Sequence, residues 1–327
     1  MSRPWPDGSA TGVGSLPGTD PLEAARWVLG ELALPHIPEL PGRGAHADLA
    51  GRGAALLTDL PVDLQPTGWR MVPRPSRDGQ RAQDLLARDL DAFEQAAADS
   101  PPVLLKAQVT GPWTLAASIE LNRGDRVLAD YGAVADLAQS LANGIELHLA
   151  DLQRRFPSTT LLLQVDEPGL PGVLAAQIPT ASGFGRLRAP APQLARERLA
   201  TVLAGHERVA VHCCARRPPV RLLVEAGATA LSLDAAMLDG RDDDDLGAAL
   251  EQGVGLLLGV VPGSDAELPS VPDVVELLGR LRDRVGLDPS ATVLTPSCGL
   301  AGAAPDYARA ALARCVEAAG AAAAEEA

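Results

Sequence analysis

Residues 255–294 read GLLLGVVPGSDAELPSVPDVVELLGRLRDRVGLDPSATVL, and this stretch decides the fold. The apolar run 255–261 indicates a buried strand, a Pro-Gly-Ser turn follows it, and apolar residues recur at helical spacing over 273–285. A second short apolar run, 292–294, predicts the next strand. Buried strands that alternate with helices are typical of a parallel sheet, because parallel neighbours need a crossover connection.

The same strand–turn–helix unit recurs along the whole chain. We predict eight strands, at 10–15, 34–40, 103–109, 160–166, 208–212, 229–234, 255–261 and 292–294. The clearest helices between and after them lie at 20–32, 131–156, 195–204, 273–285 and 305–319. Eight such units predict an α/β fold of the closed (β/α)8 TIM-barrel type.

The interval 41–102 is longer than one crossover needs, and we interpret it as a helical and loop insertion between the second and third strands. It should contain a helix at 78–98 and a loop at 61–75 near the barrel mouth. The acidic run 242–245 is typical of a solvated loop or a helix start, and the final AAAAEEA should be frayed. No repeat or linker divides the chain, so we expect one domain over 1–327.

Charge and composition narrow the possible partners. The chain has 327 residues, with 28 Lys plus Arg against 42 Asp plus Glu and a net charge of −14. Such an acidic protein is expected to bind neither nucleic acid nor anionic lipid. The sequence shows no signal-peptide core and no membrane span, and four cysteines are too few for a disulfide framework, so we expect a cytoplasmic protein.

Polar residues gather where the predicted strands end. In a barrel, functional side chains lie at the C-terminal ends of the strands. The residues at or just after those ends are Ser15, Glu39, Thr110, Asp166, His212, Cys214, Asp234, Ser264 and Cys298.

Four of these residues, His212, Cys214, Asp234 and Cys298, form the strongest constellation. Residues two apart at a strand end project in the same direction, so His212 and Cys214 can bind one ion. Two thiolates, an imidazole and a carboxylate suit tetrahedral zinc better than magnesium or calcium. The alternative is that the cysteines only pack as small apolar residues. We assign Cys213 and Cys315 to that packing role.

Six motifs in chain order resemble a known family. They are GVGSLP (12–17), KAQVTGPWT (106–114), QVDEPGL (164–170), VHCC (211–214), LSLD (231–234) and TPSCGL (295–300). Together they resemble the catalytic domain of cobalamin-independent methionine synthase. The resemblance implies a TIM barrel related to uroporphyrinogen decarboxylase and a methyltransferase that converts homocysteine into methionine.

The resemblance also implies roles for individual residues. His212, Cys214 and Cys298 would be catalytic zinc ligands, and Asp234 stands where the family has a glutamate ligand. The segment from Val13 to Ser15 would hold the carboxylate of homocysteine. Asp166 and Glu39 would bind its amino group.

The folate half of the family pattern is largely missing. Ser264 stands in place of the histidine general acid, and Ser118 and Gly172 replace a tryptophan and a glutamate that contact folate. Methyltetrahydrofolate needs a general acid because its methyl group leaves from an amine. We therefore expect a methyl-corrinoid donor in preference to folate, and a corrinoid protein as a candidate partner.

Three other functions stay open at this stage. The chain could be a corrinoid or other thiol methyltransferase of the same superfamily. It could be a non-catalytic zinc-binding barrel that binds an amino acid. Finally, Lys106 could form a Schiff base, as barrel lysines do in aldolases, although a lysine in this place also belongs to the resembling motif.

Overall fold

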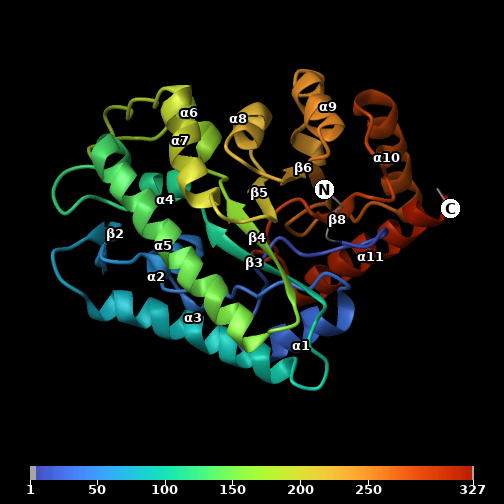
Figure 1. Cartoon of the computed structure of the whole chain (residues 1–327), viewed down its shortest axis with the longest axis horizontal. Helices are drawn as coiled ribbons and strands as arrows, with labels where there is room; N and C mark the ends of the chain where they lie inside the picture. Colours follow the sequence, from blue (N-terminus) through green and yellow to red (C-terminus); the bar gives the residue numbers. More distant parts are fainter. Residues whose placement is uncertain (1–4, 326–327) are drawn as a thin grey trace.

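The computed structural model describes residues 5–325, and its centre is a curled sheet of six parallel strands (Figure 1). The strands pair in chain order, and they are β3 (Leu104–Thr110), β4 (Thr160–Asp166), β5 (Val209–Cys213), β6 (Ala230–Asp234), β7 (Gly255–Val261) and β8 (Val293–Pro296). Nearly all of their residues are buried, as expected for strands covered on both faces. The α/β class and the six later strands are therefore confirmed.

The first two predicted strands, 10–15 and 34–40, are wrong as regular strands. Each is an extended segment with isolated parallel bridges: Ala10 pairs with Leu294 of β8, Ser15 with Glu39, and His36 with Lys106 of β3. Pro35 and Pro38 lack the N–H that a continuous ladder requires, which explains the interruption of the second segment. The two segments nevertheless lie side by side between the two edges of the sheet.

Helices surround the sheet on its outer side, and Figure 1 shows them as a ring about the central strands. In chain order they are α1 (Pro21–Glu31), α4 (Pro112–Ser118), α5 (Tyr131–Arg155), α6 (Leu170–Leu174), α7 (Pro192–Leu203), α8 (Val220–Glu225), α9 (Asp243–Glu251), α10 (Val271–Val285) and α11 (Pro305–Glu325). Short 3-10 turns, η2 (Val127–Ala129) and η3 (Ala235–Met237), follow α4 and β6. The five helices predicted between strands are present, with ends that shift by a few residues.

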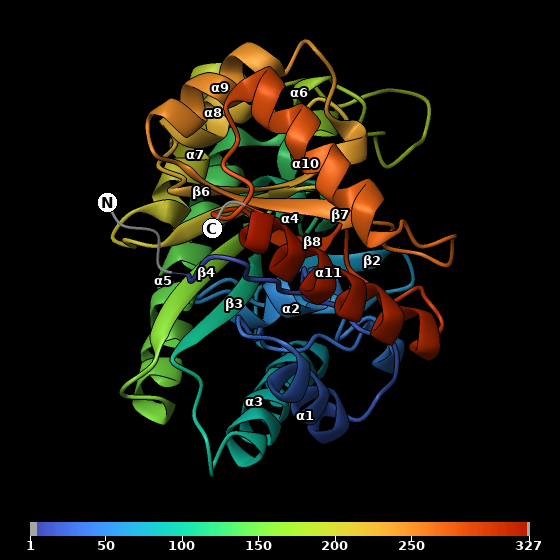
Figure 2. The same cartoon turned by 90° about the vertical axis from the view of Figure 1, so that its right-hand side faces the viewer.

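Residues 41–102, called here the layer 41–102, contain η1 (Pro41–Arg43), α2 (Leu49–Leu56), an antiparallel hairpin of β1 (Val62–Gln65) and β2 (Gly68–Met71), and α3 (Arg77–Ala96). Through α3 they lie next to α1, and through α2 they pack against β3 (Figure 2). The predicted helix is confirmed, but the predicted loop 61–75 is wrong. Its two four-residue strands are too short to show a clear alternation in the sequence.

The acidic run 242–245 is a helix start, which was one of its two predicted forms, whereas the tail predicted to fray is helical. Asp243 opens α9, where three acidic residues in the first turn favour the helix dipole. The tail predicted to fray belongs to α11 as far as Glu325, because Ala318, Ala319 and Ala322 pack into the core. Residues 326–327 lie outside the described residues. Within 5–325, none of the helices has the length and apolar character that crossing a bilayer requires.

Candidate metal centre and active site

Three of the four predicted metal ligands come together at the C-terminal end of the sheet. The ligand atoms of His212, Cys214 and Cys298 all lie within 4.8 Å of one another. His212 is in β5, Cys214 follows that strand directly, and Cys298 follows β8. Neighbouring ligand atoms of one tetrahedral zinc ion are roughly 3 to 4 Å apart, given bonds of about 2.0–2.3 Å. The spacing of the three side chains fits such an ion.

The environment of His212 leaves one ring nitrogen free for a metal. Its Nδ1 lies 2.9 Å from the hydroxyl of Ser232 in β6, while its buried Nε2 has no hydrogen-bond partner within residues 5–325. His212 and Ser232 are register partners in the sheet, so the contact follows from strand pairing. A metal-binding histidine usually has its second nitrogen fixed in this way, and the unpartnered Nε2 therefore supports the ligand assignment.

The two thiols lie within hydrogen-bonding distance of each other. Their sulfur atoms are 3.1 Å apart, and both cysteines are free. The hydrogen bond from Cys214, with a further contribution from His212, lowers the pKa of Cys298 to about 4. The same contact raises the pKa of Cys214. The contact thus favours the thiolate form of Cys298, which is the form that binds zinc.

Asp234 is not brought into this group. It ends β6, and its Oδ1 accepts a hydrogen bond of 2.9 Å from the backbone N–H of Ala236, so it caps the short turn η3. Burial raises its pKa. Its carboxylate is therefore engaged with the backbone, and the structure offers three closely spaced ligands where four were predicted.

A cavity of about 250 Å3 opens beside the three ligands. The predicted substrate residues Val13, Ser15, Glu39 and Asp166 line it together with His212, Cys214 and Cys298. Segments far apart in the sequence thus meet at one end of the sheet, as the strand-end argument predicted. The cavity is large enough for an amino acid with a short side chain.

Asp166 is held from behind by a buried polar chain. Its Oδ1 accepts a 2.7 Å hydrogen bond from Gln164, whose amide oxygen accepts one of 2.7 Å from Lys106. The Lys106 ammonium and the Gln164 amide both donate to the carbonyl of Val13. Burial lowers the pKa of Lys106 to about 8 and raises that of Asp166 to about 7. Because Lys106 is fully buried and bonded twice, it is a structural cation here, which argues against the Schiff-base alternative.

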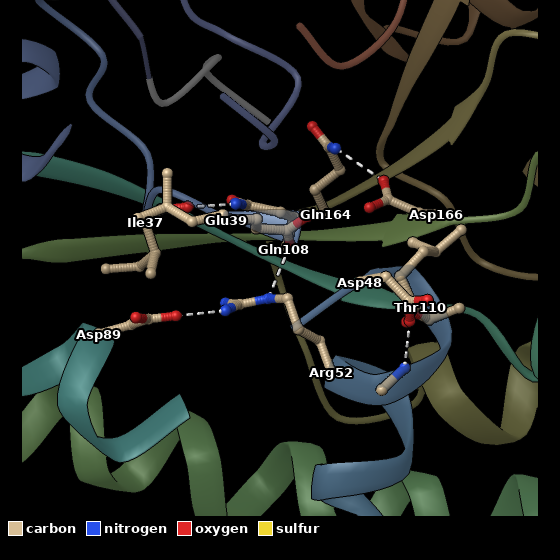
Figure 3. A network of polar contacts seen from close by, with 12 residues as sticks. Ile37, Glu39, Asp48, Arg52, Asp89, Gln108, Thr110, Gln164 and Asp166 are labelled. Carbon is tan, nitrogen blue, oxygen red and sulfur yellow. Dashed lines mark hydrogen bonds and ion pairs between the residues drawn. The ribbon is translucent and has the colours of Figure 1, made fainter. Parts of the chain in front are cut away.

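Glu39, the second predicted carboxylate, is reached from the opposite side by Arg52 of α2 (Figure 3). The Nε of Arg52 lies 3.2 Å from Oε1 of Glu39, and its Nη1 lies 2.7 Å from Asp89 of α3. Arg43 forms a two-pronged ion pair with the same Asp89, at 2.7 and 2.8 Å. All four side chains are buried or nearly so.

The remaining residues singled out in the sequence lie away from this arrangement. Cys213 and Cys315 are buried in the apolar core, as predicted. The Thr110 hydroxyl donates to the carbonyl of Leu49, and Ser118 donates to the carbonyl of Thr114 within α4. Ser264 is exposed in the loop after β7. Of these three polar residues, none lines the cavity.

Sequence reasoning did not identify Arg52, Gln164 and Ser232. Gln164 and Ser232 lie two residues before Asp166 and Asp234 and therefore share their strand face, a signal that period-two alternation could have given. Arg52 carries no such signal, because it comes from a helix in the layer formed by 41–102.

Comparison with known proteins agrees with this fold. The family model described as the catalytic domain of cobalamin-independent synthase matches residues 9–321. A B12-independent methionine synthase from Shewanella sp. W3-18-1, solved in complex with selenomethionine, superposes with a TM-score of 0.60 at 11% identity over 98% of both chains. A methyltransferase from Methanosarcina mazei superposes with a TM-score of 0.56 at 16% identity over 98% of this chain and 95% of that one. No curated protein sequence shows significant similarity. Since the family model covers nearly the whole chain, the protein belongs to the cobalamin-independent synthase catalytic-domain family and is a methyltransferase of that family.

Proposed function

We propose that the chain is a zinc-dependent, single-domain methyltransferase that moves a methyl group to the sulfur of homocysteine and gives methionine. The observation that carries this proposal is the shared cavity: three potential zinc ligands and two carboxylates for an ammonium group line the same 250 Å3 space. An amino acid with a thiol on a short side chain could address both sets of groups at once.

The proposed architecture is a (β/α)8 barrel over residues 1–327. The six regular strands would be completed by the extended segments 10–15 and 34–40, which bridge β8, each other and β3. The layer 41–102 would then be an insertion between the second and third members of the barrel. We also propose a cytoplasmic location, because thiolate ligands persist best in a reducing compartment.

The donor set fits zinc, with His212, Cys214 and Cys298 as the ligands. A zinc ion held there would lower the pKa of a substrate thiol and keep its sulfur nucleophilic at neutral pH. The protein supplies the rest through its own groups. The Ser232 hydroxyl fixes the ring of His212, and the contact with Cys214 favours the thiolate form of Cys298.

Asp166 and Glu39 would bind the substrate ammonium, and the segment from Val13 to Ser15 its carboxylate. Both carboxylates line the cavity and are held by further groups, Gln164 and Arg52 respectively. Such fixed groups orient the substrate so that its sulfur faces the donor methyl carbon. In the reaction the new carbon–sulfur bond forms as the bond between that carbon and the donor breaks. The proton that the thiol loses is taken up by the donor's leaving group.

For the donor we propose a methylated folate. The expectation of a methyl-corrinoid, and of a corrinoid protein partner, is not supported, since the matched family is by description cobalamin-independent. That expectation rested on Ser264, Ser118 and Gly172. These residues still predict slow folate turnover, because general acid catalysis contributes roughly two to four powers of ten.

The test is methyl transfer by the purified zinc-loaded protein. Homocysteine should be converted into methionine with methyltetrahydrofolate, in its mono- or polyglutamylated form, and not with methylcobalamin. Methionine formation from methylcobalamin alone would overturn the donor assignment. Zinc binding and homocysteine binding without transfer from either donor would favour a non-catalytic amino-acid-binding barrel.

A further inference from the structure

The layer 41–102 lines the substrate cavity with Pro41, Ala47 and Leu49, and its charged side chain Arg52 contacts Glu39 on the cavity wall. This residue is buried although it carries a full charge, with 6% of its surface exposed. It stands between Asp89 of α3 and Glu39 on the cavity wall (Figure 3). The layer therefore has a direct connection to the group proposed to bind the substrate ammonium.

Glu39 needs such support because its own segment is weakly held. It lies on the extended stretch 34–40, which is paired only through isolated bridges, including that from Glu39 to Ser15. Two backbone hydrogen bonds fix its main chain, from Leu16 N–H to Glu39 O and from Glu39 N–H to Gly14 O. They do not fix the carboxylate. Among the described residues, Arg52 is the cation that contacts this carboxylate, with its Nε 3.2 Å from Oε1 of Glu39.

The orientation of Arg52 is fixed in turn by Asp89. The side chain of Asp89 is 1% exposed and accepts hydrogen bonds from both Arg52 and Arg43. Arg43, Asp89, Arg52 and Glu39 thus form a chain of alternating charge whose formal sum is zero. Buried ion pairs add little net stability, because desolvation offsets the Coulomb attraction. Because this buried chain of four charges ends at the cavity wall, a role in orienting Glu39 explains it better than a contribution to the stability of the fold.

We propose that Arg52 is a positioning residue that holds the Glu39 carboxylate for the ammonium group of the amino-acid substrate, with Asp89 as its anchor. The inference rests on the proposed function, since it assumes an α-amino acid in the cavity. It assigns to the layer 41–102 the task of discriminating between thiols that carry an ammonium group and thiols that lack one.

The experiment compares two ligands by calorimetry on the zinc-loaded protein. Homocysteine is one, and 4-mercaptobutanoate, which is homocysteine without its amino group, is the other. The dissociation constant of 4-mercaptobutanoate divided by that of homocysteine reports how much the ammonium group contributes to binding. Arg52→Met should lower this ratio about tenfold, the lower end of the effect seen when partners behind a functional ligand are lost. Zinc content should stay unchanged.

Arg43→Met is the matched control. Arg43 pairs with the same Asp89 but has no contact with Glu39 among the described residues, so a merely structural network would respond alike to both substitutions. We expect the ratio of Arg43→Met to stay within twofold of the unmodified protein. If Arg52→Met does not fold, Arg52→Lys replaces it; one ammonium cannot reproduce the arginine fork between two carboxylates, so the ratio should still fall.

A double-mutant cycle completes the test. If Arg52 acts through Glu39, then Arg52→Met combined with Glu39→Gln should discriminate no worse than Glu39→Gln alone. Additive losses, or an equal loss in Arg43→Met, would overturn the inference. An unmodified protein that binds neither thiol, or both equally, would refute the proposed substrate instead.

Discussion

Replacement of Ser232 by Ala tests whether the hydrogen bond to His212 prepares the metal ligand. Ser232 is buried in β6, and its hydroxyl lies 2.9 Å from Nδ1 of His212. Without it, the metal-binding tautomer must keep a buried Nδ1–H without a partner. The metal-free protein can relieve this cost by moving the proton to Nε2, where the nearby Cys298 sulfur can accept it, whereas the zinc-bound protein cannot.

The expected loss of zinc affinity follows from this difference between the metal-free and the zinc-bound protein. A buried donor left without a partner costs about 1–3 kcal/mol. Each 1.4 kcal/mol corresponds to roughly a factor of ten. Zinc affinity should therefore fall about 10- to 100-fold, in line with the usual effect of losing a group behind a ligand.

The assay is a zinc titration against a chromogenic chelator. Ser140→Ala is the matched control. Ser140 is also buried, but its hydroxyl donates to the carbonyl of Thr58, and it lies in α5 on the outer side of the sheet. Only Ser232→Ala should lose affinity. A zinc dissociation constant within twofold of the unmodified protein would refute the assignment of Nε2 as the ligand atom.

Three further predictions concern Cys298, Asp166 and His148. Cys298→Ser should remove most of the bound zinc, because one of three close ligands is lost, and elemental analysis showing full zinc content would contradict the site. Asp166→Asn should weaken homocysteine binding and leave zinc in place; since burial raises the pKa of Asp166 to about 7, the unmodified protein should bind homocysteine less well as the pH falls through 7, and the variant should lose that dependence. Burial, followed by the positive charge of Arg52, lowers the pKa of His148 to about 4. The unfolded chain therefore binds a proton on this histidine below about pH 6.5, whereas the folded chain binds it only near pH 4. Stability should thus be full above pH 6.5 and fall by about 3 kcal/mol between pH 6.5 and 4, and His148→Leu should flatten this part of a denaturant-unfolding profile measured against pH; an unchanged slope would exclude His148 as the cause.

The regular strands could be predicted because their signal is local. β4 and β7 have the bounds that the apolar runs 160–166 and 255–261 predicted. The segment 34–40 has apolar residues as well, but a continuous strand also needs backbone donors, and Pro35 and Pro38 have none. The segment 10–15 pairs with this interrupted neighbour only through the bridge from Ser15 to Glu39. The hairpin of β1 and β2 was missed since its pairing is a property of two short pieces together and of neither alone.

The convergence of three candidate metal ligands could be predicted for a related reason. In a parallel sheet, a position at the end of a strand fixes where a side chain lies, so His212 and Cys298 could be placed together although 86 positions separate them in numbering. The fourth candidate ligand lies outside this group of three. Asp234 stands at the correct strand end, but its carboxylate accepts the N–H of Ala236 and caps a turn, a competition that short acidic side chains commonly win at such positions.

The charge network behind Glu39 could not be predicted by either route. Arg52 and Asp89 lie on helices α2 and α3, whose relative placement is set by packing between elements and not by strand period. In sequence both are charged residues of amphipathic segments, which ordinarily face solvent. What distinguishes them is burial: because a buried charge needs a partner, Arg52 must find Asp89 and Glu39 once α2 packs against the sheet. The cost of burying these charges is the physical reason for regarding the layer 41–102 as part of the active site rather than as a covering of the barrel.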